Sequence, residues 1–242
     1  MAYPTFLRPS GRFLMGTDAV GRDLFSRVVH GIATSLTVVV SVMVVSTLLG
    51  VALGALAGYR GGLLDSLIMR LVDMVQSIPG FLLAIVVVAL LGAGYEKLIL
   101  LLGLTSWTFL ARIVRAEVLS LKRREFVESA RSMGASNSRI LLFHVLPNVV
   151  PALFVLLPLM ASRLVLIEAG LAFLGLGDPD NVSLGYLISE AQPHLRYYWW
   201  LSVFPGGVLV APVLGLNLAG EALNEVLDPS AANLQQADVA AT

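Results

Sequence analysis

The chain has 242 residues, of which 57% are hydrophobic and only 13% are charged, a composition far outside that of water-soluble domains. Its 16 basic and 16 acidic residues cancel, so no overall field favours nucleic acid and charge can act only locally. The absence of cysteine excludes disulfides and thiolate metal sites, and three scattered histidines form no metal-binding pattern.

The amino-terminal segment, residues 1–31, lacks the continuous apolar stretch and the small-residue cleavage site of a signal peptide. Membrane targeting must therefore come from later segments. A spanning helix needs about 20 mostly apolar residues, because backbone groups in hydrocarbon must be satisfied internally. Five stretches meet this length, and we predict that they span: Ile32–Tyr59, Met74–Tyr95, Leu98–Leu119, Pro147–Leu176 and Tyr197–Gly220.

These spans predict an all-α, polytopic transmembrane helix bundle over residues 32–227, without a separate soluble domain. Arg112 and Arg115 interrupt the third span, and we expect them to extend toward a nearby interface. Pro79 with Gly80, and Pro205 with the two glycines after it, mark places where helices can kink or unwind.

Basic residues in short loops set the orientation of such a bundle. The loop 120–146 and the approach to it are rich in arginine and lysine, so we place them in the cytoplasm. The tail 228–242 then also lies in the cytoplasm, and we expect it to be disordered. The segment 1–31 falls on the outer side with several arginines, which is awkward without a preceding span. We therefore expect an upstream segment to be missing.

The stretch Leu121–Pro147 is too polar to span and too regularly patterned for a plain linker. Phe126, Ala130 and Met133 predict one apolar stripe of a short helix that stops at Gly134. Ser136 is placed to cap a second helix that leads to a start or kink at Pro147. This helix-turn-helix pattern fits docking to a partner protein, and it equally fits an inert loop resting on lipid headgroups.

Several motifs resemble those of a known family. The order and spacing of Glu128, Ser129, Ala130, Gly134, Leu146 and Pro147 resemble the EAA loop of ABC importer permeases, with departures at Ser129 and His144. Three further stretches are similar to the C-type permeases of dipeptide, oligopeptide and nickel importers: GTDAVGRDLFSR at 16–27, GYRGGLLD at 58–65 and EAGLAFLGLG at 168–177. These permeases usually carry one more span, before the first of these stretches.

The resemblance implies a type I ABC importer permease of the inner membrane, whose loop supplies the helix that couples to an ATPase. The residues implied for that role are Glu125, Phe126, Glu128, Ser129, Ala130, Met133, Gly134, Ala135, Leu146 and Pro147. The implied partners are a second, homologous permease, two ATP-binding subunits and an extracytoplasmic solute-binding protein. ATP and Mg²⁺ would belong to the ATP-binding subunits, so we expect no cofactor and no enzymatic activity in this chain. A phosphate-binding GxxxxGK[ST] loop is indeed absent from the sequence.

Arg163 and Glu168 lie within the fourth predicted span. A charge at bilayer depth costs at least about 2.5 to 3.5 kcal/mol, so both must face protein or water. They are candidates for the translocation path or its gate, although pairing with a neighbouring helix or a position near the outer interface explains Glu168 more simply.

Other functions stay open at this stage. An ion-coupled secondary transporter would also be hydrophobic, but such proteins usually show internal repeats, and none is evident here. An intramembrane enzyme would need a nucleophile with a base or a motif such as HExxH, and neither is present. The solute is a short peptide by the resemblance, while nickel or another small solute, and pairing with a like or unlike permease, remain alternatives.

Overall fold

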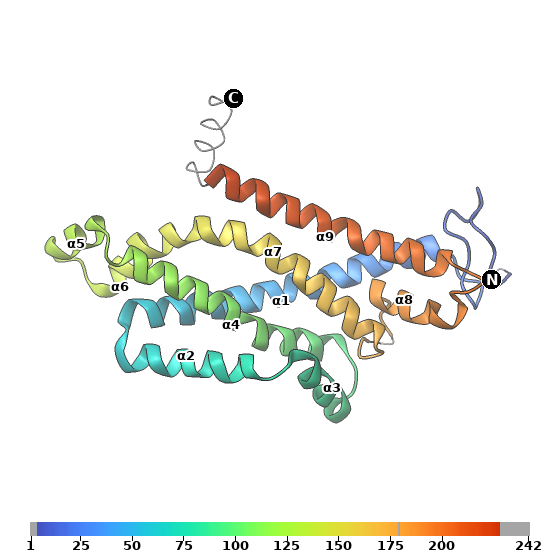
Figure 1. Ribbon diagram of the computed structural model, residues 1–242, viewed down its shortest axis with the longest axis horizontal. Helices are drawn as coiled ribbons and strands as arrows, with labels where there is room; N and C mark the ends of the chain where they lie inside the picture. Colours follow the sequence, from blue (N-terminus) through green and yellow to red (C-terminus); the bar gives the residue numbers. More distant parts are fainter. Residues whose placement is uncertain (1–3, 179, 228–242) are drawn as a thin grey trace, which may run out of the picture. The chain divides into compact units, whose positions relative to one another are not determined.

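The computed structural model describes residues 4–178 and 180–227, and most of these residues are helical (Figure 1). The elements are α1 (Leu24–Arg60), α2 (Gly62–Ser77), α3 (Gly80–Leu91), α4 (Tyr95–Leu121), α5 (Glu125–Ser132), α6 (Asn137–Ile140), the π-helical turn η1 (Leu141–Val145), α7 (Leu146–Phe173), α8 (Leu184–Ala191), the 3-10 turn η2 (Gln192–His194) and α9 (Trp200–Leu227). The predicted all-α class is confirmed. The predicted disordered tail, 228–242, lies outside the described residues.

Within residues 4–178 and 180–227, four continuous helical stretches are long and apolar enough to cross a bilayer: Leu24–Arg60, Tyr95–Leu121, Asn137–Phe173 and Trp200–Val226. Together α2 and α3 pass the same test as a bent pair, which would make a fifth span. The structure therefore contains four or five segments that can span, where the sequence predicts five.

The kink predicted at Pro79 and Gly80 is confirmed, and the bent pair of helices begins at Gly62, twelve residues before the predicted span Met74–Tyr95. The chain bends by 78° between α2 and α3, at Ile78 and Pro79. Proline has no N–H to donate, and its ring disfavours the helical conformation of the residue before it, so the helix ends ahead of Pro79. The unwinding considered for Pro205 does not occur, because α9 continues through this residue and through Pro212.

The fold divides into two compact units, and each is described by itself. The first comprises the residues up to Met43 with 78–104 and 161–215, and the second comprises 44–77, 105–160 and the residues from Leu216. Each of α1, α4, α7 and α9 contributes residues to both units.

In the second unit, three glycines on one face of α1 contact α4. They are Gly50, Gly54 and Gly58, four residues apart, a spacing that lets helix backbones approach closely in membranes. A methyl group on Gly54 would lie 2.5 Å from the carbonyl oxygen of Ala111. One on Gly50 would lie 2.6 Å from the Cβ of Leu110. These glycines therefore set the separation of α1 and α4.

Polar side chains connect α2 to α4 in the same unit. Both oxygens of the Asp65 carboxylate accept from the Arg115 guanidinium, at 2.5 and 2.6 Å. Arg112 donates to Asp73 at 2.7 Å. The Gln76 amide donates to the Thr108 hydroxyl at 3.3 Å. The sequence analysis expects Arg112 and Arg115 to extend toward an interface and does not anticipate these partners on α2. The paired residues are 39 and 50 positions apart in the chain.

The glycine contact on α1 generates a stability prediction. We expect Gly54→Ala to lower the midpoint of thermal unfolding in detergent by several degrees, because overpacking against a backbone carbonyl costs about 1 to 3 kcal/mol. Gly215→Ala is the matched control, since it also lies within a helix and a methyl group there would meet nothing within 4 Å. An equal or higher midpoint for Gly54→Ala than for the control would contradict the assignment.

Candidate functional site

The loop 120–146 forms two short helices joined by a tight turn (Figure 1). Glu125 and Glu128 lie in the first turn of α5, where carboxylates interact favourably with the helix dipole. The helix ends at Ser132, and Gly134 two residues later has a φ of +83°, a left-handed conformation that favours glycine. The Ala135 N–H then donates back to the carbonyl of Ala130 at 3.1 Å, which closes the turn.

The second helix begins as the sequence predicts. Ser136 caps α6, and its hydroxyl oxygen accepts from the backbone N–H of Arg139. The helix then continues without a break through η1 into α7, with the Leu146 N–H donating to the carbonyl of Leu141, five residues earlier. Pro147 follows directly, and a wider π turn accommodates its missing N–H and its ring. The predicted start or kink at Pro147 is therefore a local widening of a continuous helix, since α7 begins at Leu146, one residue before the proline.

The buried face of α5 differs from the predicted stripe. Ala130 is buried as expected, but Phe126 is 39% exposed and Met133 is 81% exposed. Val127 replaces them and is fully buried. A helix of eight residues offers two apolar stripes one residue apart, and only packing against its neighbours decides between them.

The buried face packs into a cluster that joins the loop to the ends of three long helices. The cluster lies within the second unit, and its buried members are Ala55, Tyr59, Val114, Val118, Val127, Ala130, Ile140, Val145 and Val149. Ala135 and Leu146, two of the predicted coupling residues, pack against it in partly buried positions. The loop is therefore fixed to α1, α4 and α7 by a close-packed interior.

The opposite surface of the loop is exposed and combines charge with large apolar groups. Glu125, Glu128, Ser129, Gly134 and Pro147 are all exposed. Phe143, on the turn that follows α6, is 72% exposed, and Phe126 and Met133 add further apolar area. Exposed apolar side chains with polar flanks are typical of surfaces that bind another protein.

The two charged residues of α7 lie in different environments, and the structure does not bring them together. Arg163 is exposed and forms no ion pair with any described residue. Glu168 is only 1% exposed, and its carboxylate accepts from the Ser35 hydroxyl at 2.9 Å and from Ser183.

Glu168 connects three helices of the first unit. Ser35 lies on α1, and its oxygen also accepts from the backbone N–H of Leu184 at 3.4 Å. Ser183 caps α8 by accepting from the N–H of Tyr186 at 3.2 Å. Glu168 therefore holds the start of α8 against α1, which agrees with the interpretation that it pairs with neighbouring helices.

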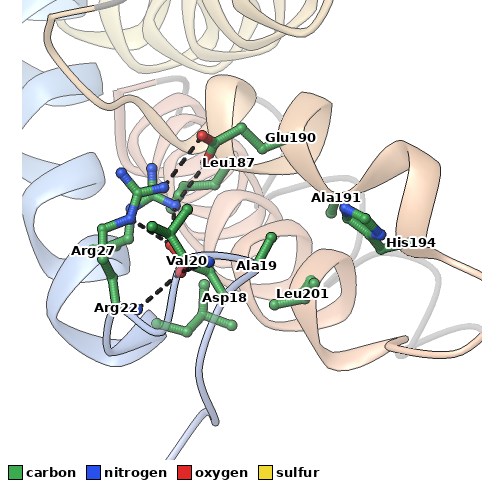
Figure 2. A pocket seen from close by; sticks show the side chains of 11 residues that line it. Asp18, Ala19, Val20, Arg22, Arg27, Leu187, Glu190, Ala191, His194 and Leu201 are labelled. Atoms are coloured by element: carbon green, nitrogen blue, oxygen red, sulfur yellow. Dashed lines mark hydrogen bonds and ion pairs between the residues drawn. The ribbon is translucent and has the colours of Figure 1, made fainter. Parts of the chain in front are cut away.

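A second group of charges lies at the other end of α8, and sequence reasoning did not assign it a role. Arg27 donates to Asp18 at 2.7 Å and to Glu190 at 2.6 Å, and Arg22 donates to the same two carboxylates at 2.6 and 3.4 Å. Figure 2 shows these side chains meeting beside a cavity of about 100 Å³. The apolar walls and rim of the cavity include Ala19, Leu24, Leu187, Ala191 and Leu201.

Asp18 organises this group. Burial by itself raises the pKa of its carboxyl, but hydrogen bonds from the N–H groups of Arg22 and Val20, together with the Arg22 guanidinium, lower the pKa below its usual value. The carboxylate is therefore ionised throughout the neutral range and holds the amino-terminal segment against α8. The motif GTDAVGRDLFSR supplies Asp18, Arg22 and Arg27, and Glu190 comes from α8.

The Glu168 contacts generate a prediction with two substitutions. We expect Glu168→Gln to unfold close to the unchanged protein in a thermal melt, because the amide oxygen can still accept from Ser35. Glu168→Leu leaves two buried hydroxyls without an acceptor and should cost about 1 to 3 kcal/mol. A glutamine variant that keeps its stability but loses function would show instead that the charge itself is required.

Comparisons with known proteins agree with this architecture. The sequence profile described as binding-protein-dependent transport system inner membrane component matches residues 50–233. The di/tripeptide transport system permease protein of Pseudomonas aeruginosa (strain UCBPP-PA14) is 38% identical over 92% of this chain and 74% of its own length. The oligopeptide transport system permease protein of Bacillus subtilis (strain 168) is 36% identical over 91% and 73%.

Among solved structures, an inward-facing form of the MetNI methionine ABC transporter matches with a TM-score of 0.70 and 20% identity. The match covers 85% of this chain and 98% of that one, and it shows a shared fold. The predicted resemblance to importer permeases is thus confirmed. The chain belongs to the family of binding-protein-dependent transport system inner membrane components, the multi-pass permease subunits of ABC importers.

Proposed function

We propose that this permease carries short peptides into the cell and couples to ATP hydrolysis through the loop 120–146. The observation that carries the proposal is the geometry of α5, Gly134 and α6. One face of this helix pair is buried against α1, α4 and α7, while the other face is exposed and partly apolar. Such a rigid projection can enter a groove of an ATP-binding subunit and pass its displacement to the attached helices.

The charge distribution supports a cytoplasmic position for this loop. Arginine and lysine are enriched in cytoplasmic loops of membrane proteins, and Lys122, Arg123, Arg124, Arg131 and Arg139 are concentrated here. The exposed residues Glu128, Ser129 and Gly134 would then face the ATP-binding subunit. Hydrolysis of ATP would take place in that separate subunit, which would also hold Mg²⁺.

The proposal that the solute is a short peptide is supported by the names of related permeases. Two of them are named as permease proteins of di/tripeptide and oligopeptide transport systems, and each aligns with more than nine-tenths of this chain. An extracytoplasmic binding protein would deliver the peptide, and a second, homologous permease would complete the pore.

Arg163 is the stronger of the two candidates for the translocation path. An exposed cation within a spanning helix needs water or another protein beside it, because lipid cannot solvate it. A path shared with the second permease meets that requirement. Glu168 contributes by holding α8 in place, as its contacts with Ser35 and Ser183 support.

A reconstitution experiment tests the proposal. The chain is co-expressed with a second permease and two ATP-binding subunits, purified as a complex and placed in liposomes with a binding protein. We expect uptake of labelled tripeptide that requires ATP. Uptake that follows an ion gradient without ATP, or a chain that recovers no ATP-binding subunit, would overturn it.

A substitution in the turn tests the coupling surface. We expect Gly134→Trp to abolish uptake while membrane insertion is retained, because a side chain there projects into open space where the partner would dock. Gly175→Trp is the matched control, since Gly175 has a similar φ of +78° and equally open surroundings but lies beyond the other end of α7. Equal uptake by the two variants would remove the coupling assignment from Gly134.

A further inference from the structure

Tyr59 lies where the coupling loop meets the transmembrane helices. It is the second-last residue of α1 and is only 6% exposed, within the buried cluster that also contains Val127 of α5 and Ile140 of α6. It belongs to the stretch GYRGGLLD, whose resemblance to peptide permeases assigns it no role.

Tyr59 contacts both arms of the loop through polar groups. Its hydroxyl donates to the side-chain oxygen of Asn137 at 3.1 Å, and Asn137 is the first residue of α6. The Lys122 ammonium donates to the Tyr59 carbonyl oxygen at 2.5 Å and lies 5.5 Å from the centre of its ring. Lys122 directly follows α4. One residue therefore links the end of α1 to the end of α4 and to the start of α6.

The neighbouring glycines explain how the tyrosine reaches this position. A methyl group on Gly58 would lie 2.8 Å from the carbonyl oxygen of Arg115 and 3.0 Å from the Cβ of Val118. The absence of a side chain at Gly58 thus brings the end of α1 against α4. Gly61, with a φ of +67°, then lets the chain leave α1 just beyond Tyr59.

The hydrogen bond of the Tyr59 hydroxyl constrains the rotation of α6, which the apolar cluster does only weakly. Apolar packing is non-directional, so it holds α6 against α1 but constrains the rotation of α6 about its own axis weakly. A hydrogen bond has a preferred direction and fixes that rotation. A movement applied to the loop is then carried to α1 and is not lost as rolling of α6.

We propose that Tyr59 is a positioning residue for energy coupling, which acts by fixing α6 to α1 through Asn137. This inference rests on the proposed function, because it assumes that an ATP-binding subunit moves the loop. The Tyr59 contact gives the movement of the loop a second route into the transmembrane helices. The covalent path leads through η1 into α7, and the Tyr59 contact leads into α1.

The test compares peptide transported per ATP hydrolysed in the reconstituted importer. Tyr59→Phe removes only the hydroxyl and keeps the buried ring. We expect the complex to assemble with a thermal midpoint close to that of the unsubstituted complex, because Asn137 is exposed and can bind water instead, while the ratio falls severalfold. Asn137→Leu should produce a similar loss, and the double variant should be no worse than either single variant.

By contrast with Asn137→Leu, Asn137→Asp should leave coupling normal, because a carboxylate oxygen still accepts from the tyrosine and suits the first turn of a helix. Ser66→Ala is the control, since it removes a hydroxyl on nearby α2 that bonds only within its own helix. It should leave the ratio unchanged.

The outcomes separate this inference from the proposed function. If the unsubstituted complex transports peptide with ATP and Tyr59→Phe does so at the same ratio, the positioning role is wrong while the proposed function stands. If the ratio falls only together with the thermal midpoint, Tyr59 is merely structural and the inference is overturned. If the unsubstituted complex shows no ATP-dependent uptake, the proposed function itself fails.

Discussion

The structure depends on one constraint, which is that polar groups buried among transmembrane helices have no water to bind. Each such group must find a partner within the protein, or face a region where another molecule supplies one. Asp65 meets this requirement by pairing with Arg115 of α4, and Glu168 meets it with the hydroxyls of Ser35 and Ser183. These contacts also decide the arrangement of the bundle, because they hold α2 beside α4 and the start of α8 beside α1.

Close backbone packing provides the second means of holding helices together in lipid, where apolar side chains gain little by leaving the hydrocarbon. The glycines at 50, 54 and 58 bring α1 against α4 within the second unit. The buried cluster beneath the loop is built on that contact, because Ala55 and Tyr59 lie among these glycines and Val114 and Val118 face them. The position of the loop therefore follows from residues that never reach its exposed surface.

The sequence predicted what depends on composition and local chemistry. It located four of the spanning segments, the stop near Gly134 and the cap at Ser136, because hydrophobic length, a left-handed turn and a hydroxyl before a helix are local signals. It did not predict which face of α5 is buried. Val127 and Met133 are both apolar, and only the packing of the neighbouring helices decides which of them is buried. It also missed the partners of Arg112 and Arg115 and the ion pairs of Glu190, which join residues far apart in the chain. The sequence analysis also did not use the four-residue spacing of Gly50, Gly54 and Gly58, which is a local signal of close helix packing.

The attachment of the loop bears on how it can transmit movement. A flexible linker would absorb a displacement, but α6 continues through η1 into α7 as one helix, so a displacement of α6 passes directly into α7. The cluster beneath it contains residues with no exposed surface, and such close-packed interiors shift between discrete arrangements more readily than they deform. The hydrogen bond from the Ala135 N–H to the Ala130 carbonyl closes the turn between the two short helices, so a force on α5 reaches α6. The loop therefore behaves as part of the transmembrane fold, and its movement has to reach the spans to which it is bonded.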